Sequence, residues 1–211
     1  MPGTLTIDLF TTLDGVAQAP GGPDEDPSDG FRFGGWQAPF LDEIVGREVV
    51  GGIARMDALV LGRRTYDIFA EYWPHHTTGI DGEIGTRLNA IPKYVASRTS
   101  PSLDWNASSL LGADLGAEIS ALRERHENVH VIGSVDLVQT LLAEQLYDVL
   151  ALWQYPLVLG GGKKVFPEGA IPTTLSLLDP PIVGSSGAVL LRYAPGGPVR
   201  TGLMEERDSG V

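Results

Sequence analysis

The chain has 211 residues, of which 43% are hydrophobic and 20% charged, as expected for one globular domain with a substantial core. Its formal net charge of -12 argues against a nucleic-acid partner, because binding phosphate backbones needs a basic face. The absence of cysteine excludes disulfides, thiolate metal sites and thiol catalysis.

The N-terminal segment predicts a strand and no targeting signal. Residues 1–10 contain neither a basic leader nor a long apolar run. The longest apolar stretch, 149–162, is interrupted and too short to span a bilayer, so we expect a cytoplasmic protein without a membrane partner. Thr4–Thr12 has leucine or isoleucine at alternating positions, which is typical of a half-buried strand.

The segment 13–37 is rich in Gly, Pro and Asp and is far longer than an ordinary connection. Such segments are functional lids or disordered loops. Within it, Trp36 either covers a substrate or anchors the loop by packing. The acidic run Asp24–Asp26 is interpreted as solvated loop.

The rest of the chain alternates between short apolar runs and helical patterns. This alternation favours an α/β fold with a mostly parallel sheet and helices on both faces. Two alternating segments around Gly184–Gly187 predict a C-terminal β-hairpin, which makes the sheet mixed. We expect helices at 39–51, 64–72, 83–89, 115–125 and 136–145, and strands at 58–61, 93–97, 129–132, 149–159, 174–183 and 188–193. Residues 1–194 then form one domain and 195–211 a mobile tail.

Several predicted strands end in glycine or hydroxyl residues beside cations. Ligands of open α/β sheets bind at the carboxyl ends of the strands, where glycine permits close backbone approach and helix N-termini attract anions. Five of the 15 basic residues lie at these ends, which favours a phosphorylated dinucleotide in so acidic a protein, although a glycine after a strand is often only a turn. The ends are Gly62–Thr65, Ser97–Thr99, Gly133–Ser134 and Leu159–Lys164.

The sequence lacks the motifs of two common nucleotide-binding folds and the spacing of a helical metal site. The first strand–helix unit has no Gly-x-Gly-x-x-Gly, and no Gly-x-x-x-x-Gly-Lys-Ser/Thr loop occurs, which argues against a Rossmann domain and a P-loop nucleotidase. His75 and His76 with Asp81 and Glu83 lack the i, i+4 spacing of a helical metal site, so we expect no metal.

The ordered motifs resemble the dihydrofolate-reductase-like superfamily. Leu59–Tyr66 resembles the strand–Gly–Arg–x–Thr–aromatic segment of dihydrofolate reductases, and Val131–Leu137 resembles their second cofactor turn. Thr12–Gly15 is similar to the Ser-Leu-Asp-Gly signature of the reductase domain in bifunctional riboflavin-biosynthesis deaminase–reductases. Tyr155–Phe166 resembles the Pro-Val-x-Leu-Gly-x-Gly block of that family. The likeness covers about residues 5–193 and is closest to stand-alone members.

By this resemblance the chain has a dihydrofolate-reductase-like fold, forms homodimers and binds NADPH. The resemblance implies a cofactor site with three parts. The first holds phosphates of NADPH, the second surrounds the adenosine end with its 2′-phosphate, and the third cradles the pyrophosphate. These parts are Gly62, Arg63, Arg64 and Thr65; then Ser97, Arg98 and Thr99; then Gly133, Ser134 and Val135. Gly160 and Gly161 of the last strand end are added to the cofactor set.

The implied activity is hydride transfer from NADPH to a small pyrimidine- or pteridine-like heterocycle. Asp14 is the catalytic candidate, either hydrogen-bonding a substrate N–H or serving as an Asp-Gly turn residue. Thr12, Trp36 and Tyr155 join it as candidate substrate contacts, with burial in the strand as the alternative for Tyr155.

Two departures keep other functions open. Ile132 stands where the riboflavin enzymes have a Glu, which lowers the case for their substrate. The helix carboxylate that engages the pterin in dihydrofolate reductases has no clear counterpart, although Asp42 or Glu43 is available. The alternatives are a nucleotide-binding module without catalysis and an authentic dihydrofolate reductase.

Overall fold

The computed structural model describes residues 2–203. Within them a nine-stranded sheet has the order β4-β3-β2-β5-β1-β6-β9-β7, with β8 also paired to β9. The six strands from β4 to β6 run parallel, and β9 is antiparallel to β6, β7 and β8. The strands are β1 Thr4–Thr12, β2 Ala58–Gly62, β3 Lys93–Ala96, β4 Ser108–Leu110, β5 Asn128–Val131, β6 Val149–Tyr155, β7 Thr174–Leu177, β8 Ile182–Val183 and β9 Val189–Gly197.

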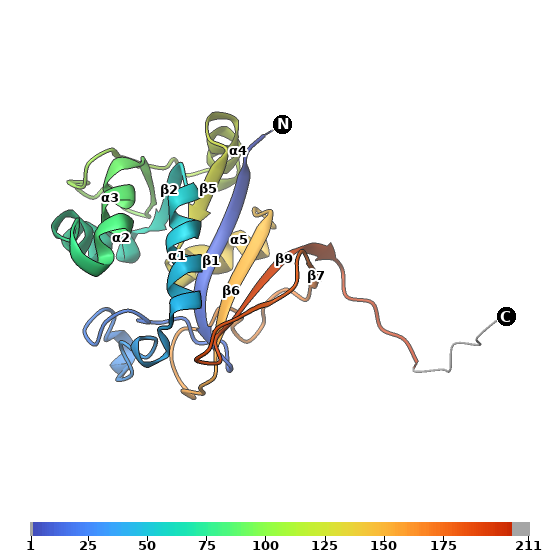
Figure 1. Cartoon of the computed structure of the whole chain (residues 1–211). Coiled ribbons are helices and arrows are strands. Elements are labelled where there is room, and N and C mark those ends of the chain that lie inside the picture. Colours follow the sequence, from blue (N-terminus) through green and yellow to red (C-terminus); the bar gives the residue numbers. More distant parts are fainter. Residues whose placement is uncertain (1, 204–211) are drawn as a thin grey trace.

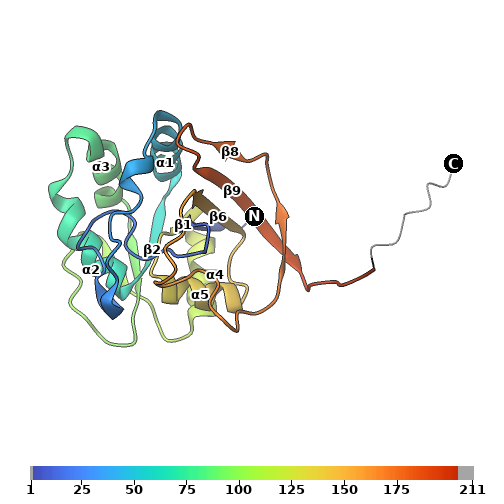
Figure 2. The ribbon, with the colours of Figure 1, turned by 90° about the horizontal axis from the view of Figure 1, so that it is seen from below.

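Helices cover both faces of this sheet, as predicted (Figures 1 and 2). α1 crosses one face, with α2 and α3 beside it, and α4 and α5 cover the other. All five residues of β2 are buried because they lie between the two helical layers. The helices are α1 Glu43–Arg55, α2 Arg63–Tyr72, α3 Gly82–Ala90, α4 Leu115–Arg125 and α5 Val135–Ala143.

The alternation of β1 divides its side chains between the two layers. Leu5, Ile7 and Leu9 are buried in a cluster with side chains of α4 and α5. The intervening side chains, Asp8 among them, therefore face the layer of α1. A second cluster joins β2 and β3 to α1, α2 and α3, and a third joins β6 and β9 to the segment before α1.

Helix starts follow local capping chemistry. Asp114 caps α4 by accepting the N–H of Ala117 at 3.0 Å, at the start of the helix expected at 115–125. The helix expected from residue 39 begins only at Glu43, because Pro39 lies in a separate 3-10 turn, Ala38–Phe40. Asp42 then caps α1 by accepting the N–H of Val45 at 2.8 Å.

The C-terminal strands correct three predictions. The hairpin exists between β8 and β9, but the strand expected at 174–183 is divided into β7 and β8. β6 ends at Tyr155 rather than Leu159, because Pro156 has no N–H for the ladder. β9 continues through Gly197 rather than ending at residue 193, and it pairs with β7. Residues 204–211 of the expected tail lie outside the described residues. The short strand β4 was missing from the sequence prediction.

None of the helices within residues 2–203 combines the length and apolar character needed to cross a membrane.

Candidate functional site

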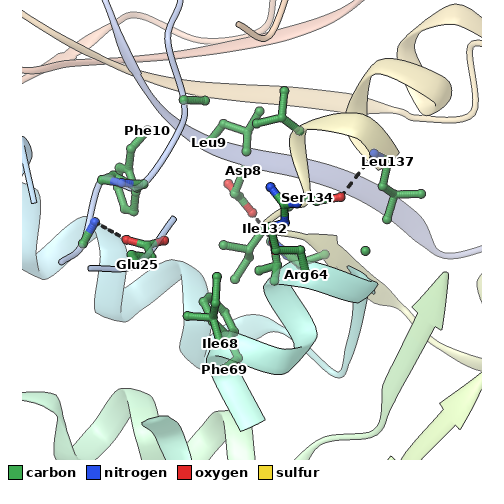
Figure 3. A pocket seen from close by; sticks show the side chains of 18 of the residues that line it. Asp8, Leu9, Phe10, Glu25, Arg64, Ile68, Phe69, Ile132, Ser134 and Leu137 are labelled. Carbon is green, nitrogen blue, oxygen red and sulfur yellow. Dashed lines mark hydrogen bonds and ion pairs between the residues drawn. The ribbon is translucent and has the colours of Figure 1, made fainter. Parts of the chain in front are cut away.

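A cavity of about 1940 Å³ follows the carboxyl ends of β2, β3 and β5 and continues under α1 (Figure 3). Asp8 and Phe10 of β1 also line the cavity, as do Glu48 and Val49 of α1. Three of the four strand ends singled out in the sequence line this cavity, and the fourth contributes Lys163. All ten predicted residues of the three ends take part: Gly62, Arg63, Arg64, Thr65, Ser97, Arg98, Thr99, Gly133, Ser134 and Val135.

The ends of β2 and β5 interlock through two glycines. The N–H of Gly62 donates to the carbonyl of Gly133 at 2.9 Å. A Cβ on Gly62 would lie inside van der Waals contact of Ser134 Oγ and 2.8 Å from the Ser134 nitrogen. Gly133 has a φ of 142°, and a Cβ there would lie 2.8 Å from Thr65 Oγ1. Only glycine fits both positions, and the two turns bring the N-termini of α2 and α5 together.

These helix N-termini give the cavity its attraction for anions. First-turn N–H groups have no partner inside a helix and carry the positive end of its dipole. Ser134 caps α5 through its Oγ, which accepts from Leu137 at 3.5 Å, whereas α2 begins at Gly62 without any side-chain cap. Such paired helix starts favour a phosphate ligand.

The cations at the rim are engaged to different extents. Arg63 pairs with Asp67 one helical turn on, at 2.7 Å, where both side chains are exposed. Arg98 makes no ion pair with any described residue. An exposed pair such as Arg63–Asp67 contributes little, so both guanidinium groups can turn toward a bound phosphate.

Asp26 corrects the interpretation of the acidic run as solvated. Its carboxylate binds Lys163 Nζ at 2.6 Å and Arg64 at 3.2 Å, and only 12% of the side chain is exposed. Burial raises the pKa of Asp26, but hydrogen bonds from Lys163 and Ser28 outweigh it and lower the pKa to about 2. The loop 13–37 is thereby fastened across the strand ends. The sequence missed this because the partners are separated by 38 and 137 positions.

The structure places Asp14 away from the cavity lining. Asp14 accepts the N–H groups of Leu159 at 3.2 Å and Gly160 at 2.8 Å, and the hydroxyl of Thr12 at 2.6 Å. Burial raises the pKa of Asp14, but these hydrogen bonds outweigh it and lower the pKa. Gly15 follows with a φ of 79°, so the segment is the Asp-Gly turn that the sequence left open. Its carboxylate joins two loops. Thr12, Gly160 and Gly161 likewise do not line the cavity.

Trp36 and Tyr155 are also absent from the cavity lining. Tyr155 is fully buried, its hydroxyl accepts from Gln37 at 2.8 Å, and burial raises its pKa to about 12. Trp36 packs edge-on against Tyr155 and donates its ring N–H to the carbonyl of Gln18 at 2.8 Å. Both take the packing role kept as the alternative in the sequence analysis.

Asp42 and Glu43 were the two carboxylates available to engage a pterin ring, and neither lines the cavity. Asp42 accepts from Val45 and also from the N–H of Ser186 at 2.8 Å, which lowers its pKa. Glu43 is exposed beside Arg47. The acidic residue that α1 does place on the cavity is Glu48, whose carboxylate pairs with Arg192 at 3.4 Å.

The histidines of the α2–α3 connection serve the local fold. His76 stacks on Tyr72, whose hydroxyl donates to Asp81 at 2.9 Å. Across residues 2–203, no group of three or more acidic or histidine side chains is arranged to hold a metal ion.

A second polar pair in the cavity was missed by the sequence prediction. Asp8 of β1 hydrogen-bonds the Nδ1 of His130 of β5, and both side chains line the cavity. Figure 3 shows Asp8 between Phe10 and the residues of the β5 end, directed at the hollow. The alternation of each strand predicts that both residues oppose the buried α4–α5 side. Their meeting depends on the parallel pairing of Thr6 with His130.

Three known proteins are similar to this chain. The uncharacterized protein YyaP of Bacillus subtilis (strain 168) is 26% identical over 195 residues, which cover 90% of this chain and 93% of that protein. The structure of a putative riboflavin biosynthesis protein from Shewanella sp. PV-4 matches with a TM-score of 0.64 and 21% identity, covering 91% of this chain and 98% of that one. Dihydrofolate reductase from Enterococcus faecalis, complexed with NADP(H), matches with a TM-score of 0.55 and 13% identity, covering 93% and 98%.

These likenesses confirm the predicted dihydrofolate-reductase-like fold. The model of the RibD C-terminal domain matches residues 3–181, which is most of the chain. The chain belongs to the RibD C-terminal domain family.

Proposed function

We propose that this protein is an NADPH-dependent reductase of a small pyrimidine- or pteridine-like heterocycle. The observation that carries the proposal is the interlocked pair Gly62 and Gly133, which brings two helix N-termini to one cavity. At about 1940 Å³ the cavity exceeds the roughly 300–1,000 Å³ common for one small ligand. It therefore has room for a dinucleotide together with a substrate.

The residues present fit NADPH. The starts of α2 and α5 would hold its phosphates through backbone N–H groups, because the close packing of Gly62 on Ser134 and of Gly133 on Thr65 brings both helix starts to the cavity. Arg98, with the hydroxyls of Ser97 and Thr99, would hold the 2′-phosphate at the end of β3. The structure of the Enterococcus dihydrofolate reductase with NADP(H) supports a cofactor of this type on the same fold.

When bound, NADPH supplies a hydride to an electron-poor carbon of the substrate. The chain's part is to position the two molecules and to exclude water. The wall formed by Phe10 and Val49 is apolar, and the loop 13–37 covers the rim through Asp26.

A substrate other than dihydrofolate fits this wall better. The carboxylates of Asp42 and Glu43 are used outside the cavity, so neither is available to a pterin ring. Family membership and the Shewanella riboflavin-biosynthesis relative favour a pyrimidine-like compound.

The test is a calorimetric titration with NADPH and with NADH. We expect sub-millimolar binding of NADPH, and Arg98→Ala should weaken it about tenfold while changing NADH binding by less than about threefold. Arg47→Ala is the matched control, because Arg47 is an exposed cation of α1 outside the cavity.

Turnover is then measured with a panel of dihydropterins, flavins and aminouracils. Oxidation of NADPH with one of them supports the reductase. Binding without any hydride transfer would assign a nucleotide-binding module instead, and failure of both nucleotides to bind would remove the proposal. Methotrexate-sensitive turnover of dihydrofolate would assign a dihydrofolate reductase.

A further inference from the structure

The cavity contains a carboxylate–imidazole pair that cofactor binding leaves without a role. Asp8 and His130 come from adjacent parallel strands, 122 positions apart, and lie on the face turned toward α1. Their side chains are 31% and 12% exposed, respectively. A partly buried charged pair of this kind normally serves either structure or chemistry.

The free ring nitrogen of His130 distinguishes these two roles. Its Nδ1 is held by Asp8, and its Nε2 has no hydrogen-bond partner among the described residues. Three side-chain atoms of the described residues are sealed from solvent without a partner, and His130 Nε2 is not one of them. Since Nε2 is neither paired nor sealed, it is reached from the cavity. A histidine that only supports the fold normally has both ring nitrogens bound, to protein groups or to ordered water.

We propose that His130 donates the proton that completes the reduction and that Asp8 is its positioning residue. The proposal rests on the proposed reductase function and specifies the substrate as a heterocycle reduced at a carbonyl or imine bond. The arrangement follows a general rule: a carboxylate that accepts from one imidazole nitrogen fixes the tautomer and directs the other nitrogen at the reacting group.

The protonated His130 ring moves one proton in this reaction. As the substrate carbon gains its hydride, the π electrons of the C=O or C=N bond move onto the oxygen or nitrogen. That atom takes the proton of Nε2, and the electrons of the broken N–H bond stay on the ring. Neutral His130 keeps its Nδ1–H on Asp8 and regains a proton from water at the cavity mouth. The substrate has then gained two electrons and two hydrogens.

Two of the other charged side chains that line the cavity, Glu48 and Arg64, are held in ion pairs, and Asp8 is the carboxylate bound to His130. From α1, Glu48 faces the cavity and is bound to Arg192 of β9. From α2, Arg64 is bound to Asp26. Arg55 of α1 also lines the cavity. The charges of these groups, together with that of Asp8, act on any pH profile measured at the site.

The first test measures the tautomer of the His130 ring in the protein without cofactor or substrate. Two-bond ¹H–¹⁵N spectra of the four histidines distinguish the Nδ1–H from the Nε2–H tautomer. In the wild type, neutral His130 should carry its proton on Nδ1, and in Asp8→Asn this preference should weaken or reverse. A neutral wild-type His130 that carries its proton on Nε2 rather than on Nδ1 would overturn the proposal.

The second test uses the substrate that the panel identifies. His130→Gln should lower kcat about 10²- to 10⁴-fold, as expected for loss of a general acid, and abolish the fall of rate toward high pH. Asp8→Asn should lower kcat less, and the Kd of NADPH should stay within about twofold in both variants. His126→Gln is the matched control, because His126 is bonded to Tyr94 at 2.9 Å and does not line the cavity.

The outcomes separate the two proposals. A wild type that turns over substrate, with a His130→Gln variant that keeps its rate and pH profile, overturns the role of His130 and leaves the reductase intact. A wild type that binds no nicotinamide cofactor removes the reductase, and the proton-donor role with it.

Discussion

Gly62 lies against Ser134 with no space between them for a side chain. This contact joins the starts of α2 and α5 at the proposed phosphate site. The sequence marks both residues, but the distance between them belongs to the tertiary structure. It makes Gly62 the most sensitive single position of the site.

Gly62→Ala should therefore damage both folding and binding. The added methyl must displace the backbone nitrogen of Ser134, and we expect a loss of about 1–3 kcal/mol in the free energy of unfolding, as for an overpacked core. NADPH binding should weaken at least tenfold. Urea denaturation and calorimetry measure the two effects.

The control for Gly62 is Gly46→Ala in α1, where a Cβ meets nothing within 4 Å. That change should leave stability equal or up to about 1 kcal/mol higher, because alanine is the better helix former. Wild-type NADPH affinity in Gly62→Ala would show that the two helix starts do not bind the phosphates.

Asp14→Asn separates a catalytic role from an anchoring one. We expect the free energy of unfolding to fall by about 1–2 kcal/mol, because the N–H groups of Leu159 and Gly160 lose a charged acceptor. NADPH affinity should stay within about twofold, since the side chain does not line the cavity. A large loss of kcat in a variant of normal stability would restore Asp14 as a catalytic residue.

The Asp14 effect should also depend on pH. The pKa of Asp14 is lowered in the folded protein from its ordinary 3.8. Its stabilisation is thus present above that ordinary value and is lost as pH falls through the lowered one. The stability difference between wild type and Asp14→Asn should shrink in acid, whereas exposed Glu168→Gln should have almost no effect at any pH.

Asp26→Asn tests whether this carboxylate competes with a phosphate. Asp26 holds Lys163 and Arg64, two cations that line the cavity. Removing its charge frees both, so NADPH should bind about 3- to 10-fold tighter, or roughly 1 kcal/mol. The unfolding free energy should fall, because two cations lose their partner.

Asp24→Asn changes the same charge in the same loop and makes no ion pair among the described residues. Its effect on NADPH binding should be smaller. Weaker binding in Asp26→Asn would indicate that Asp26 holds the two cations in their binding positions rather than competing for them.

The buried Lys93 should make the free energy of unfolding rise at alkaline pH. Its side chain is fully buried, with Nζ 3.0 Å from the carbonyl of Leu88 and 4.3 Å from the centroid of Trp105. Burial lowers its pKa from 10.5 to about 8. Between these values the native state releases the proton and the unfolded chain still binds it, so unfolding becomes less favourable as pH rises.

The rise should amount to at most about 3 kcal/mol, since one pKa unit corresponds to about 1.4 kcal/mol. Urea denaturation at pH 7.5 and pH 10 measures it in the wild type and in Lys93→Met. The variant lacks the titrating group but keeps every other one, so its stability should rise less over the same interval. Parallel curves for the two proteins would contradict the assigned ionisation.

Local chemistry was sufficient for much of the fold. The alternation of β1, the apolar run of β2 and the helical pattern of α4 each depend on neighbouring residues, and each was predicted correctly. The hairpin at Gly184–Gly187 was found for the same reason.

The sequence by itself determined the α/β alternation and the concentration of phosphate-binding chemistry at the strand ends. The tertiary structure alone decided which carboxylates face the cavity. Asp14 accepts a hydrogen bond from a loop residue 146 positions away, Asp26 binds Arg64 of α2, and Asp8 hydrogen-bonds His130. The physical reason is that parallel strands pair through long crossovers, so the partner of a side chain depends on strand order and register rather than on its neighbours in sequence.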